Sequence, residues 1–327
     1  MDYKQKGLKV AGIFAAAAVS VTLVVPAVKS QSGAIIKIDG SSTVYPITEA
    51  VAEEYQIEKK GEVQVTVGVS GTGGGFKKFC SAEEDVRTDI SDASRPIKEE
   101  EIAMCEAAGV EYIEIPVAYD AITVVANPEN PIESMTVEEL NKIWGPESEG
   151  TVTNWNQVNP EWPDGEFALF GPGADSGTFD SFTDKINGDE GASRTDYTPS
   201  EDDNVLVQGV ASEPNGFGYF GYSYYEANQD QLKAIAIDNG EGAVAPTVES
   251  IRDGSYQPLS RTVYIYVNAE AADKPEVAEF VNYYLTNAAE LIPDVGSVAL
   301  TPEEYTAGMT RFQNKELGTA AAAAAAE

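Results

Sequence analysis

Three times in this sequence a short predicted strand runs into a turn rich in glycine and hydroxyl side chains, and the turn runs into a predicted helix. The copies span residues 35–55, 65–79 and 166–186, and we call their turns, at residues 39–43, 70–75 and 171–178, the first, second and third turns. Alternating apolar residues mark the strands, and glycine lets the turns adopt positive φ angles. The repeated order predicts an α/β fold in which the turns lie at the carboxyl ends of strands.

The three turns have the chemistry of an anion site. Hydroxyl groups and the free N–H groups of a helix N-terminus donate hydrogen bonds to negative charge, and the helix dipole favours it. Ordinary N-capping explains one hydroxyl per helix, and a tight turn that binds nothing is the alternative for any single copy. The hydroxyl side chains of the three turns are Ser41, Ser42, Thr43, Ser70, Thr72, Ser176 and Thr178.

One arginine stands out in an acidic chain. Arg95 follows Ser94 at the end of another predicted strand, and a guanidinium offers a planar fork of donors to an oxyanion. A surface ion pair is the alternative interpretation. Two of the turns precede residue 120 and one follows it, so two lobes that close on each other would enclose an anion from both sides.

The composition excludes several classes of partner and of catalytic site. The net charge of -33, from 54 acidic and 21 basic residues, argues against nucleic acid and anionic membranes as partners. The chain has no histidine, which excludes Ser-His-Asp and Cys-His catalysis and histidine metal sites. A phosphatase-like or esterase-like enzyme that uses Ser176 is therefore strongly disfavoured. We expect no enzyme activity, no cofactor and no metal.

The N-terminus resembles a secretory signal. Residues 1–30 combine a basic start with an apolar stretch at 10–25 and small residues before Gln31. A retained membrane anchor is the alternative. Export to a periplasmic or other extracytoplasmic compartment favours a disulfide between Cys80 and Cys105, with two buried free thiols as the alternative. Residues 319–327 form an alanine-rich tail of low complexity.

Four segments together resemble the PstS-type phosphate-binding proteins of bacterial phosphate ABC importers. They are DGSSTVYPIT (39–48), GVSGTGGGFKKF (68–79), SDASRPI (91–97) and GADSGTF (173–179), and the resemblance covers residues 34–315. It implies the periplasmic-binding-protein type II fold, with two α/β lobes joined by hinge strands at about 116–127 and 261–268 and the ligand in the cleft. We expect lobe 1 at 31–118 plus 266–318 and lobe 2 at 119–265.

The resemblance also implies the ligand contacts. It assigns phosphate binding to Ser42, Thr43, Ser70, Thr72, Ser94, Arg95, Ser176, Gly177 and Thr178. Family members carry an arginine just before the third turn and an aspartate that accepts a phosphate proton. Here Pro172 and Gly173 precede that turn, and Arg95 resembles a replacement arginine. Asp92 and Asp175 are the candidate proton acceptors, and such a carboxylate would reject fully ionised sulfate.

The predicted function follows from the resemblance and from the turns. We expect an extracytoplasmic solute-binding protein that captures inorganic phosphate and delivers it to the membrane permease subunits of an ABC importer. A binder of another tetrahedral oxyanion such as sulfate is the nearest alternative. A surface protein without a transport role is the other, and loss of anion binding would identify it.

Overall fold

The computed structural model of the protein describes residues 34–320, which lie in one compact unit, Gly33–Glu327. The predicted signal segment at residues 1–30 and most of the alanine-rich tail fall outside the described residues. Within residues 34–320, no helix is long and apolar enough to cross a membrane.

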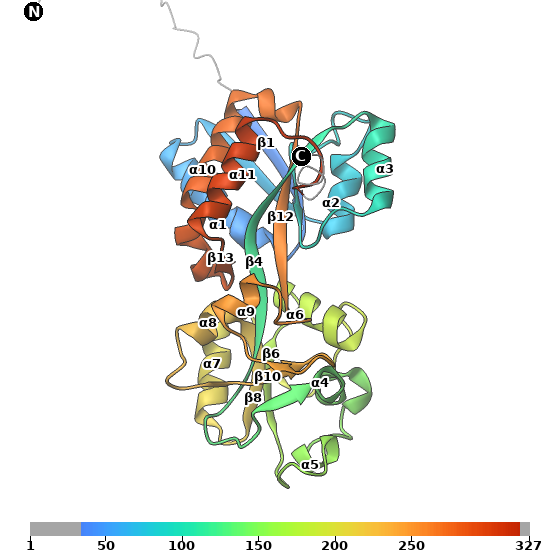
Figure 1. Cartoon of the computed structure of the whole chain (residues 1–327), viewed down its shortest axis with the longest axis vertical. Helices are drawn as coiled ribbons and strands as arrows, with labels where there is room; N and C mark the ends of the chain where they lie inside the picture. The colour runs from blue at the N-terminus through green and yellow to red at the C-terminus, as the bar shows by residue number, and fades with distance from the viewer. Residues whose placement is uncertain (1–33, 321–327) are drawn as a thin grey trace, which may run out of the picture. The chain divides into compact units, whose positions relative to one another are not determined.

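A mixed sheet of ten strands organises the fold, which confirms the predicted α/β class (Figure 1). In spatial order its main strands are β2 (Val63–Val69), β1 (Ala34–Gly40), β3 (Ile90–Ala93), β12 (Ser260–Asn268), β4 (Tyr112–Ala126), β8 (Gly216–Gly221), β6 (Ala168–Pro172) and β7 (Thr198–Ser200). The short strands β9 (Lys233–Ala234) and β13 (Val298–Ala299) pair with β4. A second, three-stranded sheet contains β5 (Ser134–Thr136), β10 (Ala236–Asp238) and β11 (Ala243–Val244). Parallel pairing joins β1 to β2 and β3, so the turns after these strands meet at one edge.

The strands β4 and β12 connect the two halves of the large sheet (Figure 1). Residues 112–121 of β4 pair with β12, and residues 122–126 pair with β8. We call the half that contains β2, β1 and β3 the first lobe, and the half that contains β8, β6 and β7 the second lobe. The predicted lobe boundaries themselves stay predictions.

One detail of these connecting strands differs from the prediction. The sequence predicts separate strands at residues 112–117 and 121–126, whereas β4 is continuous. The register shifts where Tyr264 pairs with Pro116 and Val263 pairs with Ala118, which leaves one extra residue on β4. A bulge accommodates proline because it removes the need for a backbone N–H in the ladder.

Helices cover both faces of the first lobe. The helices α1 (Tyr45–Glu58), α10 (Pro275–Leu291) and α11 (Pro302–Gln313) lie on one face, and α2 (Thr72–Phe79) and α3 (Glu99–Ala108) lie on the other (Figure 1). The spacing of Val277, Phe280, Val281 and Leu285 in the sequence predicts one apolar helix face, and all four are buried in α10, which confirms it. Tyr55 of α1 packs edge-on against Phe280 in the same core.

The second lobe contains the remaining helices of the described chain. They are α4 (Val137–Trp144), α5 (Trp155–Val158), α6 (Gly177–Phe182), α7 (Asp203–Ser212), α8 (Tyr222–Glu226) and α9 (Val248–Arg252), with a π-helical turn η2 (Thr183–Asn187) after α6. The short 3-10 turn η1 (Pro146–Ser148) follows α4, while η3 (Ala271–Asp273) and η4 (Ile292–Val295) flank α10 in the first lobe. Trp144 and Trp155 are buried against Phe217, which confirms that they are packing residues.

The glycine-rich helix begins earlier than predicted. The sequence predicts a turn at residues 70–75 and a helix from Phe76, whereas α2 begins at Thr72. Gly71 precedes it with φ of 73°, a backbone conformation that favours glycine. A Cβ added to Gly75 would lie 2.6 Å from the Cα of Gly40, so this glycine allows α2 to pack directly on β1.

The disulfide between Cys80 and Cys105 is confirmed. Cys80 follows the last residue of α2, and Cys105 lies in α3. The bridge therefore fixes together the two helices that cover this face of the first lobe.

Candidate functional site

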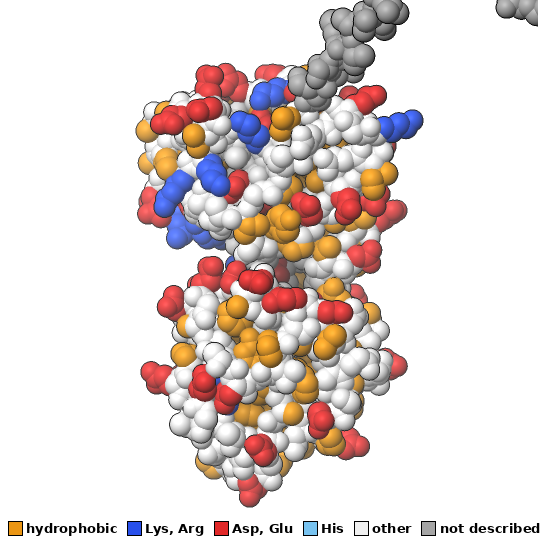
Figure 2. Space-filling view, turned by 180° about the vertical axis from the view of Figure 1, so that it is seen from behind, with side chains coloured by type: hydrophobic (Ala, Val, Ile, Leu, Met, Phe, Trp, Pro, Cys, Tyr) orange, Lys and Arg blue, Asp and Glu red, His pale blue; other side chains and the backbone are white. Residues whose placement is uncertain are grey.

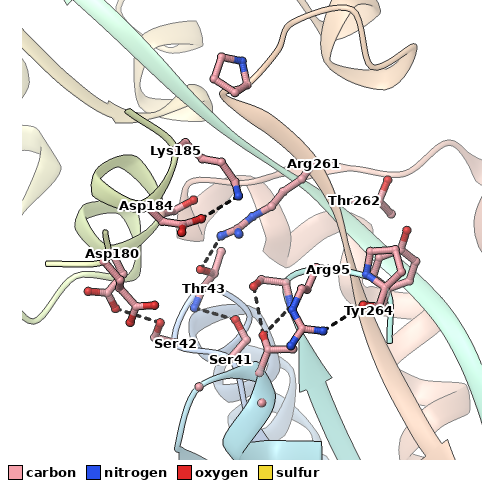
Figure 3. A pocket seen from close by; sticks show the side chains of 18 of the residues that line it. Ser41, Ser42, Thr43, Arg95, Asp180, Asp184, Lys185, Arg261, Thr262 and Tyr264 are labelled. Atoms are coloured by element: carbon pink, nitrogen blue, oxygen red, sulfur yellow. Dashed lines mark hydrogen bonds and ion pairs between the residues drawn. The ribbon is translucent and has the colours of Figure 1, made fainter. Parts of the chain in front are cut away.

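Residues of both lobes line a cavity of about 680 Å³, which we call the arginine cavity (Figure 3). The first and second turns and the Arg95 segment supply its first-lobe wall, while α6, η2 and the start of β12 supply the rest. Predicted site residues in this wall are Ser42, Thr43, Ser70, Thr72, Ser94 and Arg95. Three segments that are far apart in the sequence are thus brought together as predicted.

The first turn does not serve as a helix cap. The N-cap position of α1 is Val44, and no side chain caps this helix. The Ser42 hydroxyl instead donates to Asp180 Oδ2 at 3.1 Å, and the Thr43 hydroxyl accepts a hydrogen bond from Arg261 at 2.9 Å. Ordinary capping therefore does not explain these two hydroxyls.

The buried carboxylate of Asp39 holds the second turn and α2 in place. The Ser70 hydroxyl donates to Asp39 Oδ1, and Lys78 of α2 pairs with Asp39 Oδ2 at 2.5 Å. The Thr72 hydroxyl accepts from the Ser94 backbone N–H at 3.2 Å and lies 3.1 Å from the Ser94 hydroxyl. Since α2 also lacks a side-chain cap, the Thr72 hydroxyl links the second turn to the Arg95 segment instead of capping the helix.

Arg95 is both an ion-pair partner and a cavity residue. Its two terminal nitrogens donate to the carboxylate of Glu101, each at 2.8 Å, and one also donates to the Pro96 carbonyl. Burial acts to raise the pKa of Glu101, but hydrogen bonds from Arg95 and the Lys98 N–H lower it overall. Three of the five N–H groups of a guanidinium are used in this way. The other two, including Nε–H, have no hydrogen-bond partner among residues 34–320.

The third turn lies apart from Arg95. Ser176, Gly177 and Thr178 line a second cavity of about 640 Å³, which shares only Ser42 and Thr43 with the arginine cavity. The Ser176 hydroxyl accepts from the Thr178 N–H at 3.2 Å, so here ordinary N-capping does account for the serine. A Cβ added to Gly177 would lie 2.9 Å from the Thr43 nitrogen, and this glycine therefore permits close contact with the first turn.

Neither candidate proton acceptor lies in the arginine cavity. Asp175 is exposed and lines the second cavity. Asp92 is fully buried, lines neither cavity, and has no hydrogen-bond partner for either oxygen within the described chain. Burial raises the pKa of Asp92 to about 8, and the nearby Thr48 hydroxyl, which bonds Tyr284, offsets this only in part.

Several charged residues of the cavity wall were not predicted from the sequence. Arg261 comes from the start of β12, and the second lobe adds the pair Asp184–Lys185 at 2.7 Å (Figure 3). Burial raises the pKa of Asp180, which faces Ser42, while the hydrogen bond from Ser42 opposes it. Burial and then the Asp180 charge raise the pKa of Glu190. A cation at the first position of a predicted hinge strand was the one signal that could have identified Arg261.

The acidic character of the chain is not concentrated at this site. Figure 2 shows Asp and Glu side chains spread over the whole of one face, while Lys and Arg gather on the first lobe. Within residues 34–320, no cluster of three or more acidic or cysteine side chains is arranged to hold a metal ion. The arginine cavity offers an anion the unpaired guanidinium N–H groups of its arginines and the Thr43 hydroxyl, whose O–H is not used in accepting from Arg261.

Known proteins similar to this chain match it over most of its length. A family model described as a PBP superfamily domain matches residues 26–288. Protein SphX of Synechocystis sp. is 52% identical over 292 residues, which are 89% of this chain and 85% of that protein. The phosphate-binding protein PstS of Staphylococcus saprophyticus is 38% identical over 282 residues, 85% of this chain and 84% of the relative. The crystal structure of a "possible phosphate binding protein" from Planctomyces limnophilus has a TM-score of 0.80 at 43% identity and covers 86% of this chain and 98% of its own.

Proposed function

This chain belongs to the PstS-type phosphate-binding proteins of the periplasmic-binding-protein superfamily, and we propose that it captures inorganic phosphate in the arginine cavity. The observation that carries the proposal is the convergence of five hydroxyls and Arg95 from three separate segments on one cavity. A tetrahedral anion has four oxygens that each accept more than one hydrogen bond, so a desolvated phosphate needs a dense set of donors. The Ser42 and Ser70 hydroxyls, which donate to Asp180 and Asp39 here, would redirect their O–H groups to the anion.

Capture by lobe closure accounts for the separate position of the third turn. Ser176, Gly177 and Thr178 belong to the second lobe, and Gly177 already lies against the first turn. A small rotation of the lobes about β4 and β12 would add the donors of the third turn to those of the first lobe. We propose that phosphate stabilises this closed arrangement because only there do both sets of donors reach it.

Asp180 is the carboxylate best placed to distinguish phosphate from sulfate. It lines the arginine cavity, accepts a hydrogen bond from Ser42 of the first turn, and has a pKa raised by burial. A carboxylate accepts a hydrogen bond from protonated phosphate and repels fully ionised sulfate. We propose this role for Asp180, because Asp92 and Asp175 lie outside the cavity.

The binding role implies a place in transport. The PstS name of several relatives supports delivery of phosphate to the permease subunits of an ABC importer on the outer side of the membrane. No step of this role requires catalysis, and we propose that the protein is not an enzyme. Uptake of labelled phosphate by cells that contain or lack this chain tests delivery, and equal uptake would contradict it.

Calorimetric titration tests capture directly. The chain from Gln31 onward, which contains the whole compact unit, is titrated with phosphate and with sulfate. We expect phosphate binding without sulfate binding, and a loss of at least about tenfold in Arg95→Ala, since a hydrogen bond to a charged group contributes about 1.5–3 kcal/mol. Arg252→Ala, at an exposed arginine outside the cavity, is the control. Equal affinity for both anions would support a general oxyanion binder, and no heat with either would support a surface protein without a transport role.

A further inference from the structure

Arg261 enters the arginine cavity from the strand that connects the lobes (Figure 3). We propose that Arg261 is a second arginine of the anion site and that it couples phosphate binding to movement of the hinge strands. This inference rests on the proposed phosphate-binding function.

The contacts of Arg261 join three parts of the fold. Its Nε donates to Asp120 Oδ2 at 3.0 Å, and its Nη2 donates to the Thr43 hydroxyl at 2.9 Å. Arg261 and Asp120 are direct cross-strand partners on β12 and β4. The side chains are mostly buried, with exposed fractions of 21% and 12%. The guanidinium is therefore bonded to Asp120 of β4 through Nε and to Thr43 of the first turn through Nη2.

Arg261 keeps donors for an anion. A guanidinium has five N–H groups, and the bonds to Asp120 and Thr43 use two of them. The remaining three have no partner within residues 34–320, compared with two on Arg95. Because Nη1 is wholly unpaired in the described chain and the residue lines the cavity, Arg261 can donate to an anion without losing Asp120.

The position of Arg261 along β12 makes it sensitive to lobe movement. The ladder between β12 and β4 ends at the pairs Arg261–Asp120 and Ser260–Ala121, and from Ile122 onward β4 pairs with β8 of the second lobe. Arg261 thus lies at the point where the connecting strand passes from one lobe to the other. An anion that binds Arg261 and Thr43 therefore acts on both the first turn and this crossing point.

Asp120 is a positioning residue, because its carboxylate is paired with Arg261. Asp120 holds Nε and so fixes the plane of the guanidinium, while it lines the second cavity and not the arginine cavity. Replacing it should therefore change the orientation of Arg261 more than the number of donors that reach the anion. The effect should appear in closure as well as in affinity.

The test compares Arg261→Gln, Arg261→Lys and Asp120→Asn with the control Arg252→Gln in the chain from Gln31. Calorimetry measures phosphate affinity, and small-angle scattering measures the decrease in radius of gyration on phosphate addition. We expect Arg261→Gln to raise the Kd for phosphate about 10- to 100-fold. Arg261→Lys keeps the positive charge but loses the planar set of guanidinium donors. Compared with Arg261→Gln, it should recover part of the phosphate affinity and little of the compaction. Asp120→Asn should reduce the compaction at saturating phosphate.

The outcomes separate this inference from the proposed function. If the unaltered chain binds no phosphate, the proposed function itself fails. If it binds phosphate and both Arg261 variants match it within about twofold in Kd and in compaction, Arg261 has neither role, while the phosphate site stands. Should Arg261→Gln fail to fold by circular dichroism, Arg261→Lys decides, because an unchanged Kd and unchanged compaction in that variant overturn the proposal.

Discussion

Asp92 gives the sharpest test of the structure, because it is a fully buried carboxylate in the first-lobe sheet. Neither of its oxygens has a hydrogen-bond partner in the described part of the chain. Burying an ionised carboxylate without a partner costs several kcal/mol, so the neutral form is favoured and the pKa rises to about 8. Asp92→Asn replaces the protonated acid by a neutral group of nearly the same shape.

The sign of the effect follows from proton linkage. Below about pH 4 Asp92 is protonated in both the folded and the unfolded chain, and its contribution to stability is fully present. Between pH 4 and 8 the unfolded chain ionises while the folded chain keeps the proton, so stability is lost as pH rises. A rise in pKa from 3.8 to about 8 corresponds to a loss of about 6 kcal/mol at 1.36 kcal/mol per unit. Asparagine does not titrate and avoids this loss.

Urea unfolding at several pH values between 4.5 and 8.5 measures the difference. We expect the free energy of unfolding of Asp92→Asn, relative to the unaltered chain, to increase steadily with pH and to level off above pH 8. The difference between the two proteins matters here, because other carboxylates change the absolute stability of both. Asp175→Asn, at an exposed site, controls for the substitution itself. A pH-independent difference would refute the reasoning, since it would mean that Asp92 is ionised or solvated in the folded protein.

Three further predictions concern the supports of the site. Glu101→Gln removes one of the two oxygens that fix Arg95. We therefore expect calorimetry to show a phosphate Kd about tenfold higher. Tighter binding would instead mean that the negative charge of Glu101 mainly repels the anion. Cys105→Ser opens a disulfide whose cysteines are 25 residues apart, and we expect urea unfolding to show a loss of about 3 kcal/mol of stability, whereas an unchanged midpoint would contradict a structural role. Gly177→Ala places a Cβ 2.9 Å from the backbone of the first turn, and we expect it to reduce phosphate-induced compaction in small-angle scattering. Gly165→Ala, where a Cβ would meet only ordinary contacts, should leave that compaction unchanged.

Local patterns were enough to predict much of the fold. Alternation of apolar residues located β1, β2 and β12, and helical spacing located the buried face of α10. The turn chemistry was also local, since strand ends, glycines and hydroxyls follow each other directly in the sequence. Six predicted ligand residues therefore line one cavity, and Cys80 lies next to Cys105 as expected.

Long-range packing decided what the sequence could not predict. The strand β3 alternates, so Ile90 and Asp92 share one face and Ser91 and Ala93 the other, but only the packing of the helices decides what each face meets, and Asp92 lies near Thr48 of α1 and Tyr284 of α10. Asp92 is thereby turned into the core. Arg261 was missed for a related reason, because only the pairing of β12 with β4 places it beside the first turn.

The arrangement of charges explains how an acidic chain can bind an anion. Each arginine of the cavity is held by its own carboxylate, Arg95 by Glu101 and Arg261 by Asp120, so neither presents an unbalanced positive charge. The pairs fix the guanidinium planes before an anion arrives, which lowers the entropy cost of binding. In the proposed site, oriented N–H and O–H groups would attract phosphate at close range, where the net charge of -33 on the whole chain is largely screened. Affinity should therefore depend on the number and orientation of the donors more than on net charge.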